Sequence, residues 1–345
     1  MILDTVGMFD AAAGFPEQLA RALEVSRRAI AACVLPEHDD IANIVLLGSG
    51  GSGLAASLVL EVVGPTVPVP IVVHRGYGVP NFVDASSLVI AISLDGGSAE
   101  TLEAAQDAFD DGAAVVCIGR GGPLADWAAA SDLLHLPVLA DAPVERAALM
   151  ALAVPALVLL EGVGMYPGGE AWIEAAVGQV TRRRDELIAE DNAARRLARR
   201  LGRAFPIVYG GNGPGGVAAE FWKAQFNLNA KVAAFANRVP DLTHDEIAGW
   251  GQDGDVTRQV FQGFLLRHDF EHPQVSARMD AVEEILVEVL GAVHVVSAAG
   301  DGLLAQLLDL HLLGLFVSLH AAVEQDVDPG PVPVVTEIAS RIGEA

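Results

Sequence analysis

The chain has 345 residues, 52% of them hydrophobic, so it is long enough for two domains with substantial cores. Its 45 acidic residues against 21 lysines and arginines give a net charge of −24. Such a field repels nucleic acid and anionic lipid, so we expect neither nucleic acid nor a membrane as a partner. It also repels phosphorylated metabolites, so a phosphate site would need local amide groups and arginines.

Two isolated cysteines, Cys33 and Cys117, match neither a metal-binding pattern nor a disulfide framework, which fits a reducing cytoplasm. The first residues, MILDTVGMFDAAAGFPEQ, carry acids where a signal peptide would carry positive charge. The longest apolar stretch, residues 303–323, is interrupted by an aspartate and two histidines, which favours a buried helix over a membrane span. We therefore expect a soluble, cytoplasmic protein.

The first half of the chain alternates between two kinds of pattern. Apolar residues at helical spacing predict a helix over residues 14–34, which ends before Pro36. Helical segments then separate most of a series of short apolar runs. These runs predict strands at 43–48, 69–75, 87–93, 113–119 and 133–138. Strands that alternate with helices are typical of a parallel sheet covered by helices on both faces.

The second half repeats this organisation. Residues 148–160 and 171–202 predict helices, and the second bridges two halves of the chain. A strand then enters a glycine-rich turn at 206–216, and a helix follows at 217–228. Further strands are predicted near 232–236, 258–266 and 292–297. We expect a helical segment (1–36), a first α/β subdomain (37–170), a bridging helix (171–203) and a second α/β subdomain with C-terminal helices (204–345).

The stretch LLGSGGSGLAASL (46–58) places three glycines in G-x-G-x-x-G spacing between a strand and a helix. In a dinucleotide fold an acid should end the second strand, but His74 and Arg75 stand there and would suit only the 2′-phosphate of NADP. A glycine turn without a ligand is a second reading. In a third, Ser52 and the amides of the helix start form a cradle for phosphate or sugar hydroxyls.

A second loop strengthens the cradle reading. The stretch AISLDGGSAETL (91–102) runs from a strand end through glycines into a helix, with Ser93 and Ser98 as hydroxyl donors. Ser98 also reads as the N-cap of that helix, and capping is compatible with ligand binding. Two adjacent strand ends that both present hydroxyls and amides would form one site.

Six segments carry a family resemblance. In chain order they are GSGGSG (48–53), HRGYGVPNFVDASSLVIAIS (74–93), ERAAL (145–149), FWKAQFNLNAKVAAF (221–235), THDEIAGW (243–250) and VDPGPV (327–332). Together they resemble the sugar isomerase (SIS) domain proteins, specifically the bifunctional phosphoglucose/phosphomannose isomerases. The resemblance implies an α/β fold of two SIS-type subdomains, each a five-stranded parallel sheet flanked by helices, in a homodimer. It implies interconversion of glucose 6-phosphate or mannose 6-phosphate with fructose 6-phosphate, without a metal or organic cofactor.

The resemblance also implies roles for individual residues. It gives His244, supplied by the partner subunit, the opening of the sugar ring, and gives Arg146 the stabilisation of the enediolate. Without it, His244 reads as a polar turn residue and Arg146 as a surface ion-pair residue. The implied phosphate-binding positions are Gly50, Gly51, Ser52, Ser93 and Ser98.

The catalytic base is where the sequence departs most from the family. The family motif N-E-N-A-K carries the glutamate base, and here NLNAK places Leu228 at that position. A positioned base contributes roughly 10²–10⁴ to the rate, so its loss would leave little isomerase activity. Asp245, Glu246 and Glu220 are the candidates for a replacement base.

Two further departures concern the phosphate loop and the C-terminal tail. A serine of the second loop is replaced by Asp95, whose carboxylate would oppose a nearby phosphate by about 4 kcal/mol per charge pair. It would instead accept hydrogen bonds from the hydroxyls of an uncharged sugar, so we count Asp95 among the substrate-binding residues. Residues 328–345 lack the lysine that the family carries near its C-terminus.

We expect the ligand to be a sugar phosphate or a related sugar. Three functions remain open for this protein. The first is a phosphosugar isomerase whose base comes from another position. The second is a catalytically silent sugar-binding or regulatory protein, and the third is an NADP-binding enzyme.

Overall fold

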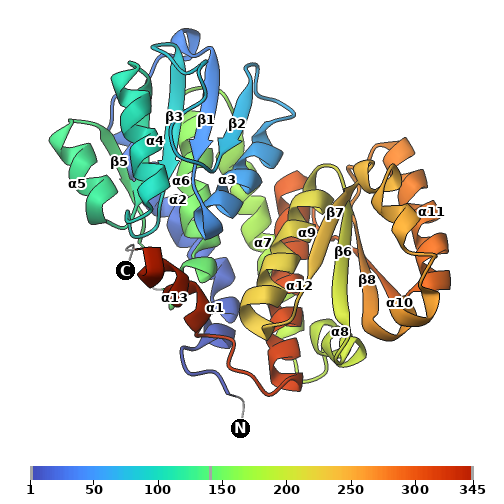
Figure 1. Cartoon of the computed structure of the whole chain (residues 1–345). Coiled ribbons are helices and arrows are strands. Elements are labelled where there is room, and N and C mark those ends of the chain that lie inside the picture. Colours follow the sequence, from blue (N-terminus) through green and yellow to red (C-terminus); the bar gives the residue numbers. More distant parts are fainter. Residues whose placement is uncertain (1–2, 140–141, 343–345) are drawn as a thin grey trace. The chain divides into compact units, whose positions relative to one another are not determined.

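The computed structural model describes residues 3–139 and 142–342 (Figure 1). The chain divides into two compact units. The N-terminal unit is Phe15–Val177, and the C-terminal unit is Gly178–Ala345 together with Met1–Gly14. The division falls within helix α7 (Gly169–Leu187).

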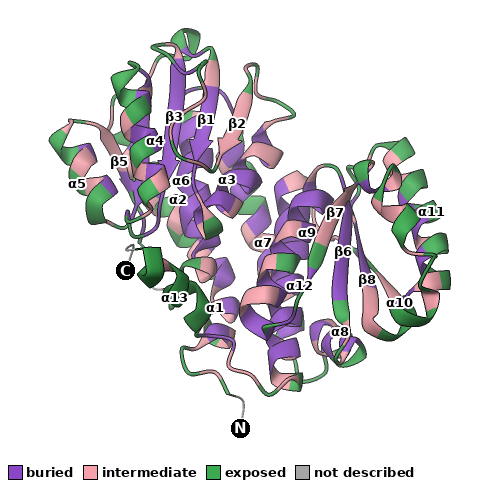
Figure 2. Cartoon of the chain, viewed as in Figure 1, coloured by how far each residue is buried: buried purple, intermediate pink, exposed green. Residues whose placement is uncertain are grey.

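The N-terminal unit is built on a five-stranded parallel sheet with the order β2-β1-β3-β4-β5. Its strands are β1 (Asn43–Leu47), β2 (Ile71–His74), β3 (Ser87–Ile92), β4 (Ala114–Gly119) and β5 (Leu134–Pro137). Every residue of β3 is buried, whereas the edge strand β2 is only partly covered (Figure 2). Continuous apolar runs in the central strands are what a parallel sheet covered on both faces requires.

The helices of this unit follow the strands in the expected alternation. They are α2 (Phe15–Ala31), η1 (His38–Asp40), α3 (Gly50–Val63), α4 (Ala99–Asp110), α5 (Gly122–Ala130), η2 (Glu145–Ala147), α6 (Leu149–Gly162) and the start of α7. Small residues on α4, such as Ala104, Ala105 and Ala108, are fully buried against the sheet. The predicted strand positions are confirmed to within about two residues at each end.

The C-terminal unit holds a second parallel sheet with the order β7-β6-β8-β9. Its strands are β6 (Phe205–Gly211), β7 (Phe235–Val239), β8 (Phe261–Arg267) and β9 (Ala292–Ser297). Its helices are α1 (Met8–Ala13), the rest of α7, α8 (Ala193–Leu201), α9 (Pro214–Gln225), η3 (Phe226–Ala230), η4 (Asp241–Thr243), η5 (Glu246–Gly249), α10 (Gly254–Val260), α11 (Pro273–Val289), α12 (Leu303–Glu324) and α13 (Pro333–Ile342). The fold class is confirmed, with two parallel sheets flanked by helices.

Two details of the C-terminal unit differ from expectation. The second sheet has four strands rather than five among the described residues, because the chain passes from β9 into the long apolar helix α12. The single bridging helix expected over 171–202 is also broken between α7 and α8. Asn192 causes the break, because its side chain accepts a hydrogen bond from the Arg195 amide (2.8 Å) and donates to the Ala189 carbonyl (2.8 Å).

Helix α12 is the spine of the C-terminal unit. Among the described residues it alone has the length and hydropathy of a membrane span, and 89% of its most apolar window is buried inside the protein. Asp309 at its centre is fully buried and accepts paired hydrogen bonds from Arg183 of α7 at 2.8 and 2.7 Å. This buried ion pair ties α7 to α12, as in the core helix of a soluble protein.

His311, two residues further along α12, makes the unit sensitive to acid. Burial lowers its pKa to about 3, whereas the unfolded chain has the ordinary value of 6.5. Below pH 6.5 the unfolded state therefore binds a proton at His311 that the folded state does not bind. The free energy of unfolding consequently has its full value above pH 6.5 and decreases as the pH falls below it. We expect this histidine to remove about 2 kcal/mol from the free energy of unfolding between pH 7 and pH 5.

The variant His311→Leu isolates this contribution. We would measure the free energy of unfolding of both proteins with urea at pH 7 and at pH 5. Its decrease from pH 7 to pH 5 should be about 2 kcal/mol smaller in the variant than in the wild type. Equal losses in both proteins would contradict the assignment.

Candidate functional site

The strand order of the N-terminal unit singles out one edge of its sheet. The chain order reverses between β1 and β3, because β2 pairs with the outer side of β1 while β4 pairs with the outer side of β3. In open α/β sheets, ligands bind at the carboxyl ends of the strands at such a reversal. The loops that open α3 and α4 lie there, and they contain all six predicted substrate-binding residues.

The loop before α3 can only be built from glycine at two positions. Gly50 has a φ of +54°, and a Cβ at Gly53 would lie 2.8 Å from the carbonyl oxygen of Gly48. The tight turn brings the start of α3 to the sheet edge. Ser52, in the first turn of this helix, is buried.

A carboxylate occupies the start of this helix. Oε1 of Glu145 accepts hydrogen bonds from the amide of Ser52 (3.2 Å) and from its hydroxyl (2.9 Å). The side chain crosses Gly51, where a Cβ would lie 3.3 Å from Cγ of Glu145. Although Glu145 is exposed as a residue, its carboxylate points at the buried Ser52. Sequence reasoning did not single out Glu145, because its partner lies 93 positions earlier.

Two further acids share this edge. Burial raises the pKa of Glu145, and the negative charges of Asp95 and Glu100 raise it further, against the hydrogen bonds from Ser52. Burial also acts to raise the pKa of Glu100, but hydrogen bonds from Ser49, from its own amide and from Ser98 outweigh it, so this pKa is lowered. Three carboxylates therefore belong to this edge of the sheet, and the charges of Asp95 and Glu100 act on Glu145.

The remaining predicted residues of the second loop have identifiable local roles. Ser98 caps α4 by accepting from the Thr101 amide (3.4 Å) and donates its hydroxyl hydrogen to Oγ1 of Thr101 (2.8 Å). Asp95 is exposed, and its Oδ1 accepts from the Gly97 amide (3.1 Å). Ser93 is buried at the end of β3. Hydrogen bonds within the loop therefore hold Ser98 and Asp95, and the Asp95 carboxylate is turned to solvent.

The cations near this edge differ in their surroundings. Arg146 follows Glu145 in η2, and burial lowers its pKa to about 10, which leaves it charged at neutral pH. Arg75, which an NADP site would need, donates to the carbonyl of Gly53 (3.1 Å) and to the hydroxyl of Ser57 (2.5 Å). Arg75 therefore serves to hold α3 against β2, which weighs against the NADP reading.

The C-terminal unit contains the segment that carries the base in the family. Helix α9 continues into the π-helical turn η3, and Leu228 lies half-buried within it. The side-chain amide of Asn229 is buried and donates to the hydroxyl of Ser318 (2.9 Å). The ammonium group of Lys231 donates to the carbonyls of Leu228 and of Pro329 (3.2 Å). Such turns often mark functional sites, and here hydrogen bonds of Asn229 and Lys231 hold the backbone around position 228.

Each acid that could replace the base already holds another group. Glu220 forms an ion pair with Arg238 at 2.7 Å. Glu246 accepts a hydrogen bond from the hydroxyl of Tyr209, whose pKa is raised by burial and by this carboxylate. Asp245 accepts from the Glu246 amide at 2.5 Å. These contacts engage all three carboxylates within this unit.

The candidate catalytic residues belong to different units. His244 is exposed at the end of η4, and its Nε2 lies 3.5 Å from a guanidinium nitrogen of Arg278. The same nitrogen of Arg278 donates to the hydroxyl of Thr243 (2.8 Å). Arg146 lies in the N-terminal unit, beside the cradle.

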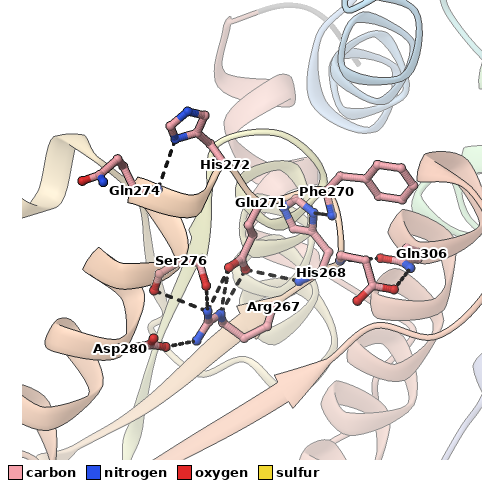
Figure 3. A network of polar contacts seen from close by, with 10 residues as sticks. Arg267, His268, Phe270, Glu271, His272, Gln274, Ser276, Asp280 and Gln306 are labelled. Carbon is pink, nitrogen blue, oxygen red and sulfur yellow. Dashed lines mark hydrogen bonds and ion pairs between the residues drawn. The ribbon is translucent and has the colours of Figure 1, made fainter.

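A polar network follows β8 in the C-terminal unit (Figure 3). Arg267 donates to Glu271 (3.0 Å), to Asp280 (2.7 Å) and to the hydroxyl of Ser276 (2.8 Å). A cavity of about 390 Å³ adjoins it, lined by Arg267, His268, Asp269, Glu271, Ser276, Val295, Ser297 and Ala298. Two acids already neutralise Arg267, so the network fixes the turn into α11 rather than offering a charge to a phosphate.

The fold agrees with proteins that handle phosphosugars. The C-terminal domain of glucosamine-fructose-6-phosphate aminotransferase from Francisella tularensis superposes with a TM-score of 0.68 at 15% identity, over 94% of this chain and 97% of that one. Glucosamine-6-phosphate deaminase from Thermotoga maritima gives a TM-score of 0.65 at 14% identity, over 92% and 97%. Residues 190–342 match the model of the bacterial phospho-glucose isomerase C-terminal SIS domain. The chain is therefore an SIS-type α/β protein.

Sequence relatives define the family more narrowly. A bifunctional phosphoglucose/phosphomannose isomerase from Caldicellulosiruptor bescii is 32% identical over 98% of this chain and 99% of its own length. Another, from Thermoplasma acidophilum, is 29% identical over 87% of this chain and 89% of its own. The chain belongs to the bifunctional phosphoglucose/phosphomannose isomerase family, as its motifs predicted.

Proposed function

We propose that this protein is a sugar-binding member of the family that performs the aldose–ketose isomerisation only slowly. Its ligand is a sugar phosphate or a related sugar, held in the cradle formed by the loops before α3 and α4. It works as a soluble homodimer in the cytoplasm and uses no cofactor. The reaction named for its relatives, phosphoglucose and phosphomannose isomerisation, is the reaction that it performs slowly.

The observation that carries this proposal is Leu228. Aldose–ketose isomerisation moves a proton between two neighbouring carbons of the sugar, which requires a group that can accept and return a proton. Leucine can do neither, and Glu220, Asp245 and Glu246 are occupied by other partners. We therefore expect a rate below that of a family enzyme by about 10²–10⁴.

The rest of the machinery supports ligand binding. Arg146 remains charged beside the cradle, where it can stabilise negative charge on a bound sugar. His244 is exposed and can reach a ligand or a second subunit. The cradle supplies the hydroxyl groups of Ser49, Ser52 and Ser98, which can donate to or accept from sugar hydroxyls.

Restoring the acid tests the proposal. We expect Leu228→Glu to raise isomerisation of fructose 6-phosphate by about 10²–10⁴ over the wild type, because the hydrogen-bonded π-turn already positions the side chain. Leu228→Gln has the same shape without an ionisable group and should give no gain. Product formation is followed by proton NMR, with fructose 6-phosphate and with fructose. A wild type as fast as a family isomerase, and no faster with Leu228→Glu, would sink the proposal.

The homodimer is supported by an uncovered apolar stripe on α13. Val334, Val335, Ile338 and Ile342 fall on one face of this helix and are each between 54% and 64% exposed (Figure 2). Exposed stripes of this kind mark association sites. Sedimentation velocity should show twice the 35.9 kDa chain mass, and Ile338→Glu should shift the protein toward monomer. A wild-type monomer at micromolar concentration would contradict the dimer.

A further inference from the structure

The start of α3 is occupied by the protein itself. Amide groups at a helix start bind anions, and a serine hydroxyl in the first turn adds a donor. In this protein the anion is the carboxylate of Glu145, which accepts from both the amide and the hydroxyl of Ser52. A phosphate that used the same two donors would first have to displace this carboxylate.

Displacement would not remove the obstacle. Glu145 lies in η2 beside the cradle, and its carboxylate already feels the charges of Asp95 and Glu100. A phosphate group in the cradle would therefore meet the carboxylate of Glu145 and would add to the charges of Asp95 and Glu100 at the same edge. Each like-charge pair about 4 Å apart lowers affinity by up to about a thousandfold at the dielectric typical near a protein surface.

The same groups suit a different ligand. Carboxylates are acceptors, and hydrogen bonds to a charged acceptor are about twice as strong as neutral ones. The hydroxyl groups of Ser49 and Ser98 at this edge can both donate and accept. A sugar end that offers hydroxyl or ammonium hydrogens would satisfy this arrangement without like-charge repulsion.

We propose that Glu145 determines the ligand class of the cradle: it selects a sugar end that bears hydroxyl or ammonium donors over one that bears phosphate. This inference rests on the proposed function, because it assumes that the cradle is the sugar site. Asp95 and Glu100 reinforce the choice from the second loop. Glu145 is thus a specificity residue rather than part of the proton-transfer machinery.

The test is a set of ligand titrations of the full chain at neutral pH and constant ionic strength. Ligand-observed NMR would measure affinities for glucosamine, fructose, fructose 6-phosphate and inorganic phosphate. The wild type should prefer glucosamine and fructose to the two phosphates. Glu145→Gln should raise the affinity for fructose 6-phosphate and phosphate at least tenfold and lower that for glucosamine about tenfold.

The chain offers a matched control in the same unit. Oδ1 of Asp84 accepts from the amide (2.8 Å) and the hydroxyl (2.6 Å) of Ser86, the same pair of donors that Glu145 uses. Asp84 precedes β3, at the opposite edge of the sheet, so Asp84→Asn should leave all four affinities unchanged. Asp95→Ser is a second test variant, which removes a charge from the cradle without disturbing Ser52 and should also raise phosphate affinity.

The outcomes separate the inference from the proposed function. Tight binding of fructose 6-phosphate by the wild type, unchanged in Glu145→Gln and Asp95→Ser, would overturn the inference and leave sugar binding intact. Equal gains in Asp84→Asn and Glu145→Gln would also overturn it, because the effect would then follow net charge alone. If neither the wild type nor any variant binds these four ligands at millimolar concentration, both the inference and the proposed function are wrong.

Discussion

The hydrogen bonds from Ser52 to the carboxylate of Glu145 decide what the carboxyl edge of the first sheet can hold. The strand order and the glycine turn bring a helix start to this edge, which is a ready site for an anion. The chain fills that site itself. Whatever binds there must either replace a carboxylate or make use of it.

Two parts of the chain depart from the family in opposite senses. At position 228 an acid is missing where isomerisation needs a base, although Asn229 and Lys231 keep the surrounding turn in place. In the cradle, Asp95 stands where the family resemblance implies a serine, and the carboxylate of Glu145 accepts the hydrogen bonds of Ser52. On the proposal above, these two features together describe a family member that binds a sugar and performs the isomerisation slowly.

The sequence predicted the fold well because its signals are local. Apolar runs bounded by glycines located the strands, and the spacing of Gly48, Gly50 and Gly53 located the tight turn. It missed Glu145 because the contact with Ser52 joins distant segments and leaves no local pattern. For the same reason it could not show that Glu220 and Glu246 are held by Arg238 and Tyr209. The four-stranded second sheet was missed because the five-stranded expectation came from the family.

The most direct test of the missing base is hydrogen exchange into a bound sugar. The wild-type protein would be incubated with fructose 6-phosphate, and separately with fructose, in heavy water and followed by proton NMR. Abstraction of a C1 proton replaces it with deuterium even when no product is released. We expect the C1 proton signals to decay about 10²–10⁴ more slowly than with a family isomerase run in parallel. Their loss at an enzymatic rate, with deuterium at C2 of an aldose product, would show that a base acts despite Leu228 and would contradict the account.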